Sequence, residues 1–200
     1  MRRLAEAIPT SLVVFRFVVG PVILALAWAF GLPWRSACAV LLALGVLSDI
    51  LDGIIARRLG VSTPGLRKLD SKADVAFWIC VFAAALVLRP IVIPVLAPMA
   101  AALVALEFVA PIVSLVRFRQ EASTHHYLSK AFGLGLWLLM SVLFLHGPLL
   151  WLEIAVFALG VASQAEAIAI MLTIPAWRAD VRGLGHALAL RAEARAGDRA

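Results

Sequence analysis

Six long apolar stretches, separated by short polar or Pro- and Gly-containing segments, dominate the sequence. Each has about 20 residues or more, the length at which an α-helix crosses a hydrocarbon core of about 30 Å. We therefore predict six transmembrane helices, at residues 9–32, 37–58, 70–88, 92–118, 127–145 and 149–174. Residues 1–8 carry Arg2, Arg3 and Glu6 among apolar residues, and we predict a short interfacial helix there that leads into the membrane.

The composition agrees with this pattern. A hydrophobic fraction of 64% and a mean hydropathy of +1.01 exclude an ordinary soluble domain. The predicted fold class is an all-α integral membrane protein, with residues 1–175 as its membrane domain and residues 176–200 as a basic cytoplasmic tail. The first apolar run continues past Arg16 to Phe30, so we expect a retained helix and not a signal peptide. Cys38 and Cys80 lie in apolar segments and are expected to be buried thiols.

Four aspartates, Asp49, Asp52, Asp70 and Asp74, lie within 26 residues. The first two are three residues apart and the last two are four apart, so on helices each pair shares one face. We expect the Gly-, Pro- and Arg-rich stretch between the pairs to be a turn that brings them together. Each ionised Asp costs about 2.5–3.5 kcal/mol at the centre of a membrane helix. Such a cluster therefore indicates bound cations, and carboxylate oxygens suit Mg²⁺ or Mn²⁺.

Two other interpretations of charged positions stay open. The aspartates could instead be helix caps and interfacial ion pairs with nearby basic residues, namely Arg57, Arg58, Arg67 and Lys68. Arg16, about two turns into the first apolar run, could extend to the membrane surface. Alternatively, Arg16 faces the polar pocket and balances carboxylate or phosphate charge.

The basic residues predict the orientation. With a cytoplasmic N-terminus, six spans return the C-terminus to the same side, and every Lys and Arg except Arg16, Arg35 and Arg89 falls on that side. The positive-inside rule favours this topology. We expect a bacterial inner-membrane protein with both termini and the four aspartates on the cytoplasmic side. The net charge of +6 then reflects topology and contact with anionic lipids, and we expect no nucleic-acid partner.

The aspartates also form part of a longer pattern. Residues 49–57 read DxxDGxxAR, and Asp70 and Asp74 complete a second part, DxxxD. This arrangement resembles the signature of the CDP-alcohol phosphotransferase family, DxxDGxxAR followed by GxxxDxxxD. One position departs from it, because Leu66 stands where the second glycine is expected and Gly65 comes one place earlier.

The resemblance implies roles for the four aspartates. In that family the first three motif aspartates bind a pair of divalent ions, and the fourth deprotonates the acceptor hydroxyl. Carried over to this chain, Asp49, Asp52 and Asp70 would be metal ligands. Asp74 would be the general base and a further ligand.

The same resemblance implies a substrate site and a reaction. Gly53, Ala56 and Arg57 would line the site for CDP. An alcohol would attack the phosphorus distal to cytidine in a CDP-alcohol and release CMP, with two Mg²⁺ or Mn²⁺ ions as cofactors. The expected donor is CDP-diacylglycerol, the expected process is phospholipid synthesis, and a homodimer is implied.

The sequence leaves alternatives open for the acceptor substrate and for the class of protein. Arg117, Arg119 and Lys130 share the predicted side of the aspartates and could bind a phosphorylated acceptor such as glycerol 3-phosphate, or be ordinary loop charges. The same motif would serve a soluble CDP-aminoalcohol with diacylglycerol as acceptor. An intramembrane prenyltransferase is disfavoured because its Asp-rich motifs lie far apart in sequence. An ion- or proton-coupled transporter would place charges near the midplane of the membrane and would show a repeated half.

Overall fold

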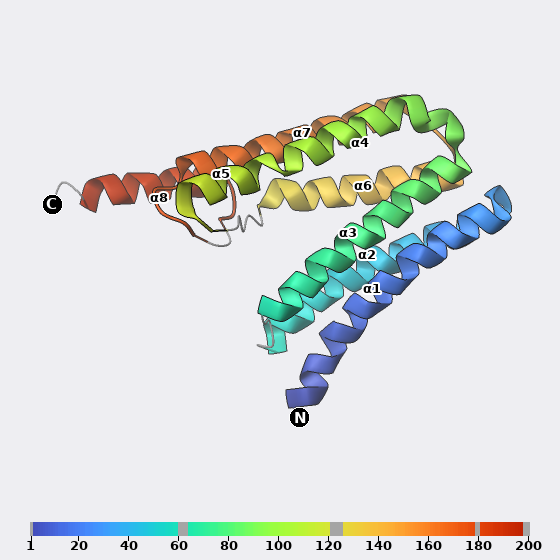
Figure 1. Ribbon diagram of the computed structural model, residues 1–200, viewed down its shortest axis with the longest axis horizontal. Helices are drawn as coiled ribbons and strands as arrows, with labels where there is room; N and C mark the ends of the chain where they lie inside the picture. Colours follow the sequence, from blue (N-terminus) through green and yellow to red (C-terminus); the bar gives the residue numbers. More distant parts are fainter. Residues whose placement is uncertain (1, 60–63, 121–125, 179–180, 198–200) are drawn as a thin grey trace. The chain divides into compact units, whose positions relative to one another are not determined.

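The computed structural model describes residues 2–59, 64–120, 126–178 and 181–197, without the side chains of residues 2–7, 57, 64, 67, 68 and 197. All regular elements of these ranges are helical (Figure 1). The elements are α1 (Arg2–Phe30), η1 (Leu32–Trp34), α2 (Arg35–Leu59), α3 (Pro64–Leu88), η2 (Pro90–Val92), α4 (Ile93–Glu107), α5 (Val109–Phe118), α6 (Tyr127–Leu145), α7 (Leu150–Thr173) and α8 (Leu184–Gly197).

Six segments of the described chain are long and apolar enough to cross a membrane. They are Ile8–Phe30, Leu32–Ala56, Leu69–Leu88, Pro90–Phe118, Tyr127–Leu145 and Leu150–Thr173. The predicted all-α membrane fold with six spans is therefore confirmed. The protein is a multi-pass integral membrane protein.

Two boundaries differ from those read off the hydropathy pattern. The expected interfacial helix at residues 1–8 is the first part of α1, which continues through Pro9 into the first span. The third helix begins at Pro64 and not near Asp70, so most of the predicted turn between the aspartate pairs is helical. Proline suits the first helical position, because the N–H that it lacks would have no partner there. Charged residues in this first part of α3 lower its hydropathy without preventing a helix.

The fourth span is interrupted, as its prolines predict. The α-helical pattern stops at Phe108 between α4 and α5. Pro111 has no N–H to donate to the carbonyl of Glu107, four residues earlier, and proline rings clash with that carbonyl in a regular helix. Gln164 of α7 donates a hydrogen bond to Glu107 Oε2, so a polar contact lies beside this break.

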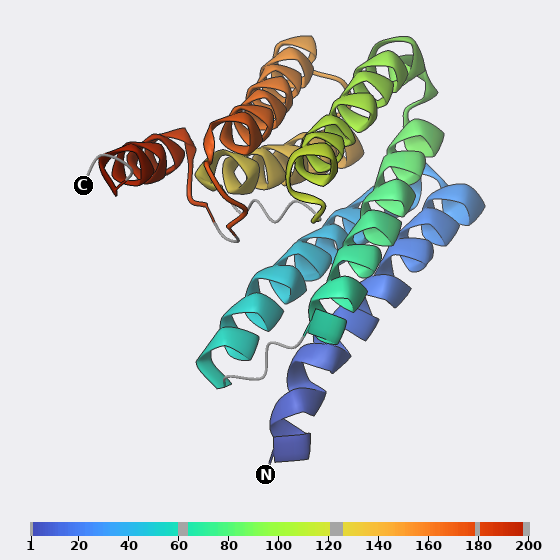
Figure 2. The same cartoon turned by 60° about the vertical axis from the view of Figure 1, so that its left-hand side comes forward.

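The chain forms two compact units, and the first contains residues 1–93 and 137–149. In this unit α1 packs along both α2 and α3, which make fewer contacts with each other (Figures 1 and 2). Its core contains Ile23, Leu42 and Val81, all fully buried. Arg89, just after α3, donates hydrogen bonds to the carbonyl oxygens of Leu143 and Phe144, and so joins the end of α3 to the end of α6.

Two glycines allow the first three helices to approach closely. A Cβ atom at Gly45 of α2 would lie 2.4 Å from Cε2 of Phe77 on α3. A Cβ atom at Gly20 of α1 would lie 3.0 Å from the Cα atom of Phe77. Phe77 is 1% exposed, so its ring has little room to move. Gly20, Gly45 and Phe77 therefore define how near α1 and α2 come to α3.

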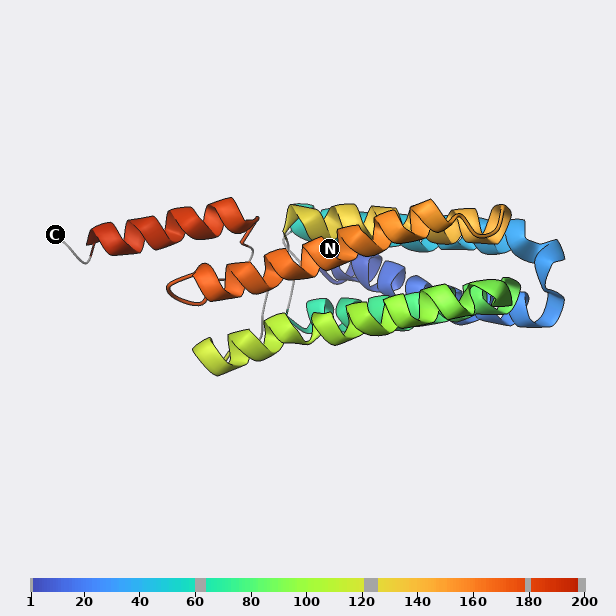
Figure 3. The same ribbon diagram turned by 90° about the horizontal axis from the view of Figure 1, so that it is seen from above.

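The second unit contains residues 94–136 and 150–200. Buried residues of α5, α7 and α8 form its core, and they include Ala110, Ile170, Met171 and Ala187. Val181, between α7 and α8, is also fully buried. The C-terminal ends of α5 and α7 lie at the same end of this unit as α8 (Figures 1 and 3). Part of the expected tail from residue 176 thus packs against α7 as a helix.

The start of α8 is held by a side chain of α7. Glu166 Oε1 accepts a hydrogen bond of 3.1 Å from the backbone N–H of Leu184, the first residue of α8. A carboxylate at a helix N-terminus satisfies an otherwise unpaired N–H and interacts favourably with the helix dipole. This contact and the burial of Ala187 anchor α8 to α7.

The close approach at Gly45 leads to a testable prediction. Gly45→Ala would force the Phe77 ring to shift, and overpacking of this kind costs about 1–3 kcal/mol. We expect a lower thermal unfolding midpoint in detergent, partly restored by adding Phe77→Leu. Gly133→Ala in α6 is the matched control, since no described neighbour lies within 4 Å of its added Cβ. That variant should be neutral or stabilising, and an equal loss in both would contradict the packing explanation.

Candidate functional site

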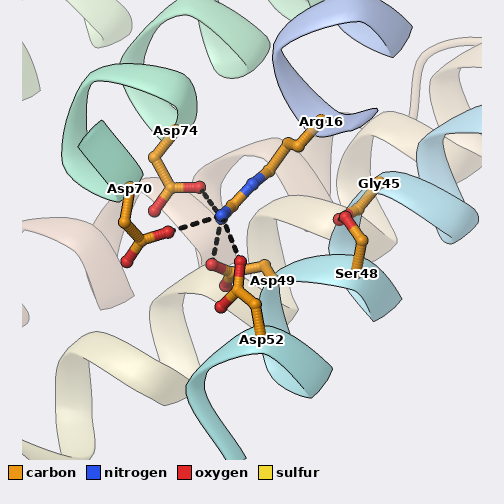
Figure 4. A network of polar contacts seen from close by, with 7 residues as sticks. All are labelled: Arg16, Gly45, Ser48, Asp49, Asp52, Asp70 and Asp74. Carbon is orange, nitrogen blue, oxygen red and sulfur yellow. Dashed lines mark hydrogen bonds and ion pairs between the residues drawn. The ribbon is translucent and has the colours of Figure 1, made fainter. Parts of the chain in front are cut away.

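Three helices of the first unit bring five charged side chains together. Arg16 comes from α1, Asp49 and Asp52 from α2, and Asp70 and Asp74 from α3 (Figure 4). Within α2 and α3 the helical spacing puts both members of each aspartate pair on one face. Because α1 packs against both other helices, Arg16 can reach both pairs. We call these five residues the Asp–Arg cluster.

The guanidinium group of Arg16 lies at the centre of this cluster. Its Nη2 atom donates to Asp52 Oδ2 at 2.7 Å and also to Asp70 Oδ1. Its Nη1 atom donates to Asp49 Oδ1 and Asp74 Oδ1. The side chain is fully buried, so the interpretation that Arg16 extends to the membrane surface is wrong. Arg16 instead faces the polar pocket and balances carboxylate charge.

The cluster is open on the side of the carboxylates. The side chains of Asp49, Asp70 and Asp74 are 42%, 37% and 37% exposed, whereas that of Asp52 is 5% exposed. Four carboxylates face one guanidinium, so negative charge remains in excess within the cluster. Excess negative charge in a partly buried site attracts cations strongly, because the interaction is weakly screened there.

Three of the carboxylates are spaced closely enough to share a metal ion. One oxygen from each of Asp49, Asp70 and Asp74 lies within 4.8 Å of the others. Opposite oxygens around an octahedral Mg²⁺ ion are about 4.2 Å apart, so small side-chain rotations would suffice. The hard oxygen donors and the excess negative charge both fit a divalent cation. Asp52, the most buried of the four, lies outside this group of three.

Apolar packing lies one helical turn from the cluster. Phe77 follows Asp74 by three residues on α3, and Gly45 precedes Asp49 by four residues on α2. Phe77 and Gly45 are in close contact. Ser48 is 4% exposed, and its hydroxyl group donates a hydrogen bond to the carbonyl oxygen of Gly45 (Figure 4). The hydroxyl is thereby satisfied within α2. Tight packing on this side restricts how the carboxylates can move.

The predicted CDP-binding residues follow the first aspartate pair on α2. Gly53 is half-buried and directly follows Asp52, and Ala56 is 7% exposed in the next turn. Because the side chain of Ala56 is a single methyl group, it leaves little between the helix backbone and a group that approaches it. The backbone of Arg57 continues α2, and its side chain lies outside the described part of the structure. Leu66, at the position of the expected motif glycine, is half-buried in the first turn of α3.

The three candidate acceptor residues belong to the second unit. Arg117 of α5 donates hydrogen bonds to the carbonyl oxygens of Met171 and Ile174, at the C-terminal end of α7. Arg119 is exposed and ends α5 in the left-handed conformation, with a φ of 54°. Lys130 is exposed, with its Nζ atom 5.7 Å from the centre of the Tyr127 ring. No hydrogen bond or ion pair joins these three among the described residues.

The second unit contains a largely buried polar group, His126, Ser163 and Glu166, whose members no motif in the sequence connects. His126, just before α6, is 3% exposed, and its Nε2 atom lies 3.2 Å from Ser163 Oγ and 3.8 Å from Glu166 Oε2. Both contacts involve the same ring nitrogen, so this is not the relay arrangement of a serine hydrolase, which uses both nitrogens. The spacing of Ser163 and Glu166 on one face of α7 was the available signal. The group supports the position of α8 through Glu166.

Comparison with known proteins identifies the family. No curated protein and no solved structure gives a significant match to the chain. A family model described as CDP-alcohol phosphatidyltransferase matches residues 6–177 of the 200 residues. The matched region contains Arg16 and all four aspartates, and it confirms the resemblance seen in the DxxDGxxAR and DxxxD patterns. The chain therefore belongs to the CDP-alcohol phosphatidyltransferase family.

Proposed function

We propose that this protein transfers a phosphatidyl group from CDP-diacylglycerol to an alcohol and releases CMP. The family transfers substituted phosphate groups from CDP-alcohols and is generally metal-dependent. The observation that carries the proposal is the Asp–Arg cluster, which places all four motif aspartates around one position at one end of three helices. The proposed orientation, with these carboxylates on the cytoplasmic side, would give a water-soluble acceptor access to them.

The aspartates have two proposed roles. Asp49, Asp52, Asp70 and Asp74 would hold two Mg²⁺ or Mn²⁺ ions, the metals that prefer carboxylate oxygens. Such ions, when bound, stabilise the charge on the transferring phosphate and on the leaving group. Asp74, which is partly exposed, would also accept the proton of the acceptor hydroxyl. The exposure of Asp74 supports this role, because an incoming alcohol can reach its carboxylate.

The proposed reaction is a single displacement at phosphorus. The alcohol oxygen forms a bond to the phosphorus distal to cytidine, and its proton passes to Asp74. The bond between that phosphorus and the bridging oxygen breaks, and CMP leaves with the electron pair. Gly53, Ala56 and Arg57 would line the CDP site, where small residues let a ligand approach the helix and an arginine can donate two hydrogen bonds to phosphate.

The acceptor is proposed to be glycerol 3-phosphate or a similar phosphorylated alcohol. Arg119 and Lys130 are exposed cationic side chains with the charge such an acceptor needs. Arg117 is a weaker candidate, because its guanidinium group already donates hydrogen bonds to two backbone carbonyls. A homodimer is also proposed, on the family resemblance alone.

The experiment that tests this function measures CMP release. Purified protein in lipid would receive CDP-diacylglycerol, Mg²⁺ or Mn²⁺, and a panel of alcohols that includes glycerol 3-phosphate, serine and inositol phosphate. We expect CMP formation that requires one acceptor and stops when a chelator removes the ions. CMP release only from a CDP-aminoalcohol with diacylglycerol would support the alternative donor. Failure to bind CDP with metal would contradict the proposed chemistry altogether.

Two conservative substitutions should separate the aspartate roles. Asp74→Asn removes the base, and loss of general base catalysis typically lowers turnover by about 10²–10⁴-fold, with CDP binding largely kept. Asp52→Asn should weaken both turnover and binding, because Asp52 is the most buried carboxylate and pairs with Arg16. Nucleotide binding and CMP release would be measured for both. Glu193→Gln on α8 is the control, and near-normal turnover of Asp74→Asn would refute its role as the base.

The central position of Arg16 gives a prediction about metal and stability. Arg16→Gln leaves four carboxylates without their guanidinium partner, and breaking buried ion pairs costs about 3–5 kcal/mol. In chelator we expect a much lower unfolding midpoint. Added Mg²⁺ should raise the midpoint more for this variant than for the wild type, because the guanidinium no longer competes for the carboxylates.

The exposed Arg35 provides the control for this comparison. Arg35→Gln removes the same charge outside the cluster and should leave both midpoints unchanged. If Mg²⁺ raised neither the wild-type nor the Arg16→Gln midpoint, the cluster would be a self-contained ion network without a metal role.

A further inference from the structure

A second charged feature lies at the end of α7, in the second unit. A pocket of about 200 Å³ is lined by residues of α5, of the end of α7 and of α8. Three arginines, Arg117, Arg191 and Arg195, line it together with Leu172 and other residues at the end of α7. We call it the α8 pocket. Part of its wall lies outside the family match, which ends at residue 177.

Two exposed arginines of α8, Arg191 and Arg195, line this pocket. Arg191 and Arg195 are four residues apart, so they project from one face of α8. Among the described residues, neither forms an ion pair with a carboxylate. Like charges at this spacing destabilise a helix modestly. An anion between them would remove that repulsion, and forked guanidinium groups suit phosphate in particular.

Arg117 adds to the positive potential of the pocket, but, unlike Arg191 and Arg195 in the described part of the structure, it donates hydrogen bonds to backbone carbonyls. Its guanidinium donates to the carbonyl oxygens of Met171 and Ile174, which would otherwise lack partners at the end of α7. The charge therefore stays fixed at the pocket wall without depending on a ligand. Among the described residues, Arg191 and Arg195 form no ion pair with a carboxylate, so their guanidinium groups can turn toward an anion.

The α8 pocket lies at a membrane boundary. The span that contains α7 ends at Thr173 and the span that contains α5 ends at Phe118, while Arg117 and Thr173 both line the pocket. Leu172, also in the wall, is 55% exposed at the end of its span. Leu188 of α8 is 53% exposed and precedes Arg191 by three residues, so an apolar side chain lies on the same helix face as the arginines.

From these observations we infer that the α8 pocket binds the phosphate headgroup of an anionic phospholipid. Arg191 and Arg195 would contact the phosphate, and Leu172 and Leu188 would contact the beginning of an acyl chain. The exposed leucines favour a lipid over free phosphate, because inorganic phosphate offers nothing to cover them. The site goes beyond the proposed reaction, since it holds a lipid at α8 and requires no turnover.

Lipid binding by the full chain in a neutral detergent tests this inference. Native mass spectrometry would compare phosphatidylglycerol with phosphatidylcholine of the same acyl chains, and inorganic phosphate would be added as a competitor. We expect preferential retention of phosphatidylglycerol and little competition by millimolar phosphate. Arg191→Gln and Arg195→Gln should each weaken its binding about fivefold, as expected for one basic residue near an anionic lipid surface.

Matched variants keep the test specific. Arg182→Gln removes the same charge from an exposed side chain that does not line the pocket, and should leave lipid binding unchanged. Arg195→Lys keeps the charge but loses the forked donor, so its affinity should lie between that of Arg195→Gln and that of the wild type. Both α8 arginines are exposed, so all unfolding midpoints should match the wild type.

Three results would overturn the inference. Equal retention of the two lipids would remove the headgroup preference. An equal loss in Arg182→Gln would indicate general charge attraction to the lipid. Full displacement of the lipid by inorganic phosphate would identify a site for free anions. Because the assay needs no substrate, it can succeed or fail independently of CMP release.

Discussion

The neutralisation of buried charge is the constraint on which the first unit depends. Four carboxylates on otherwise apolar helices are costly in a low-dielectric environment unless cations compensate them. Arg16 provides one such cation from a third helix, fully buried and bonded to all four aspartates. The interaction therefore couples α1, α2 and α3 at the polar end. Gly20, Gly45 and Phe77 hold the same three helices together one turn away.

This arrangement links stability to chemistry. One guanidinium does not balance four carboxylates, and three of them remain partly exposed. Arg16 thus compensates part of the carboxylate charge, and the remaining negative charge favours the binding of further cations. A phosphotransferase needs this combination, because its substrate carries a pyrophosphate whose charge must be compensated while an alcohol attacks. In the proposed reaction, the same carboxylates would serve as metal ligands and as the base.

Polar groups in the second unit have a different use. Arg117 satisfies the carbonyl oxygens that end α7, and Glu166 satisfies an N–H that begins α8. Gln164 contacts Glu107 beside the break between α4 and α5. Each of these side chains compensates backbone or side-chain groups where a helix begins, ends or breaks. Among the described residues, Arg191 and Arg195 are the basic pair of this unit that lines a pocket and forms no ion pair.

The sequence by itself determined the six spans, because hydrophobic length is a local property, and it determined the aspartate pairs, because helical spacing puts each on one face. The motif also led correctly to the family. The start of α3 at Pro64 could not be read from hydropathy, since polar residues can be helical. Only tertiary structure decided between the two interpretations of Arg16. Its partners lie 33 to 58 residues away along the chain, and a charge inside an apolar run does not reveal which neighbour compensates it.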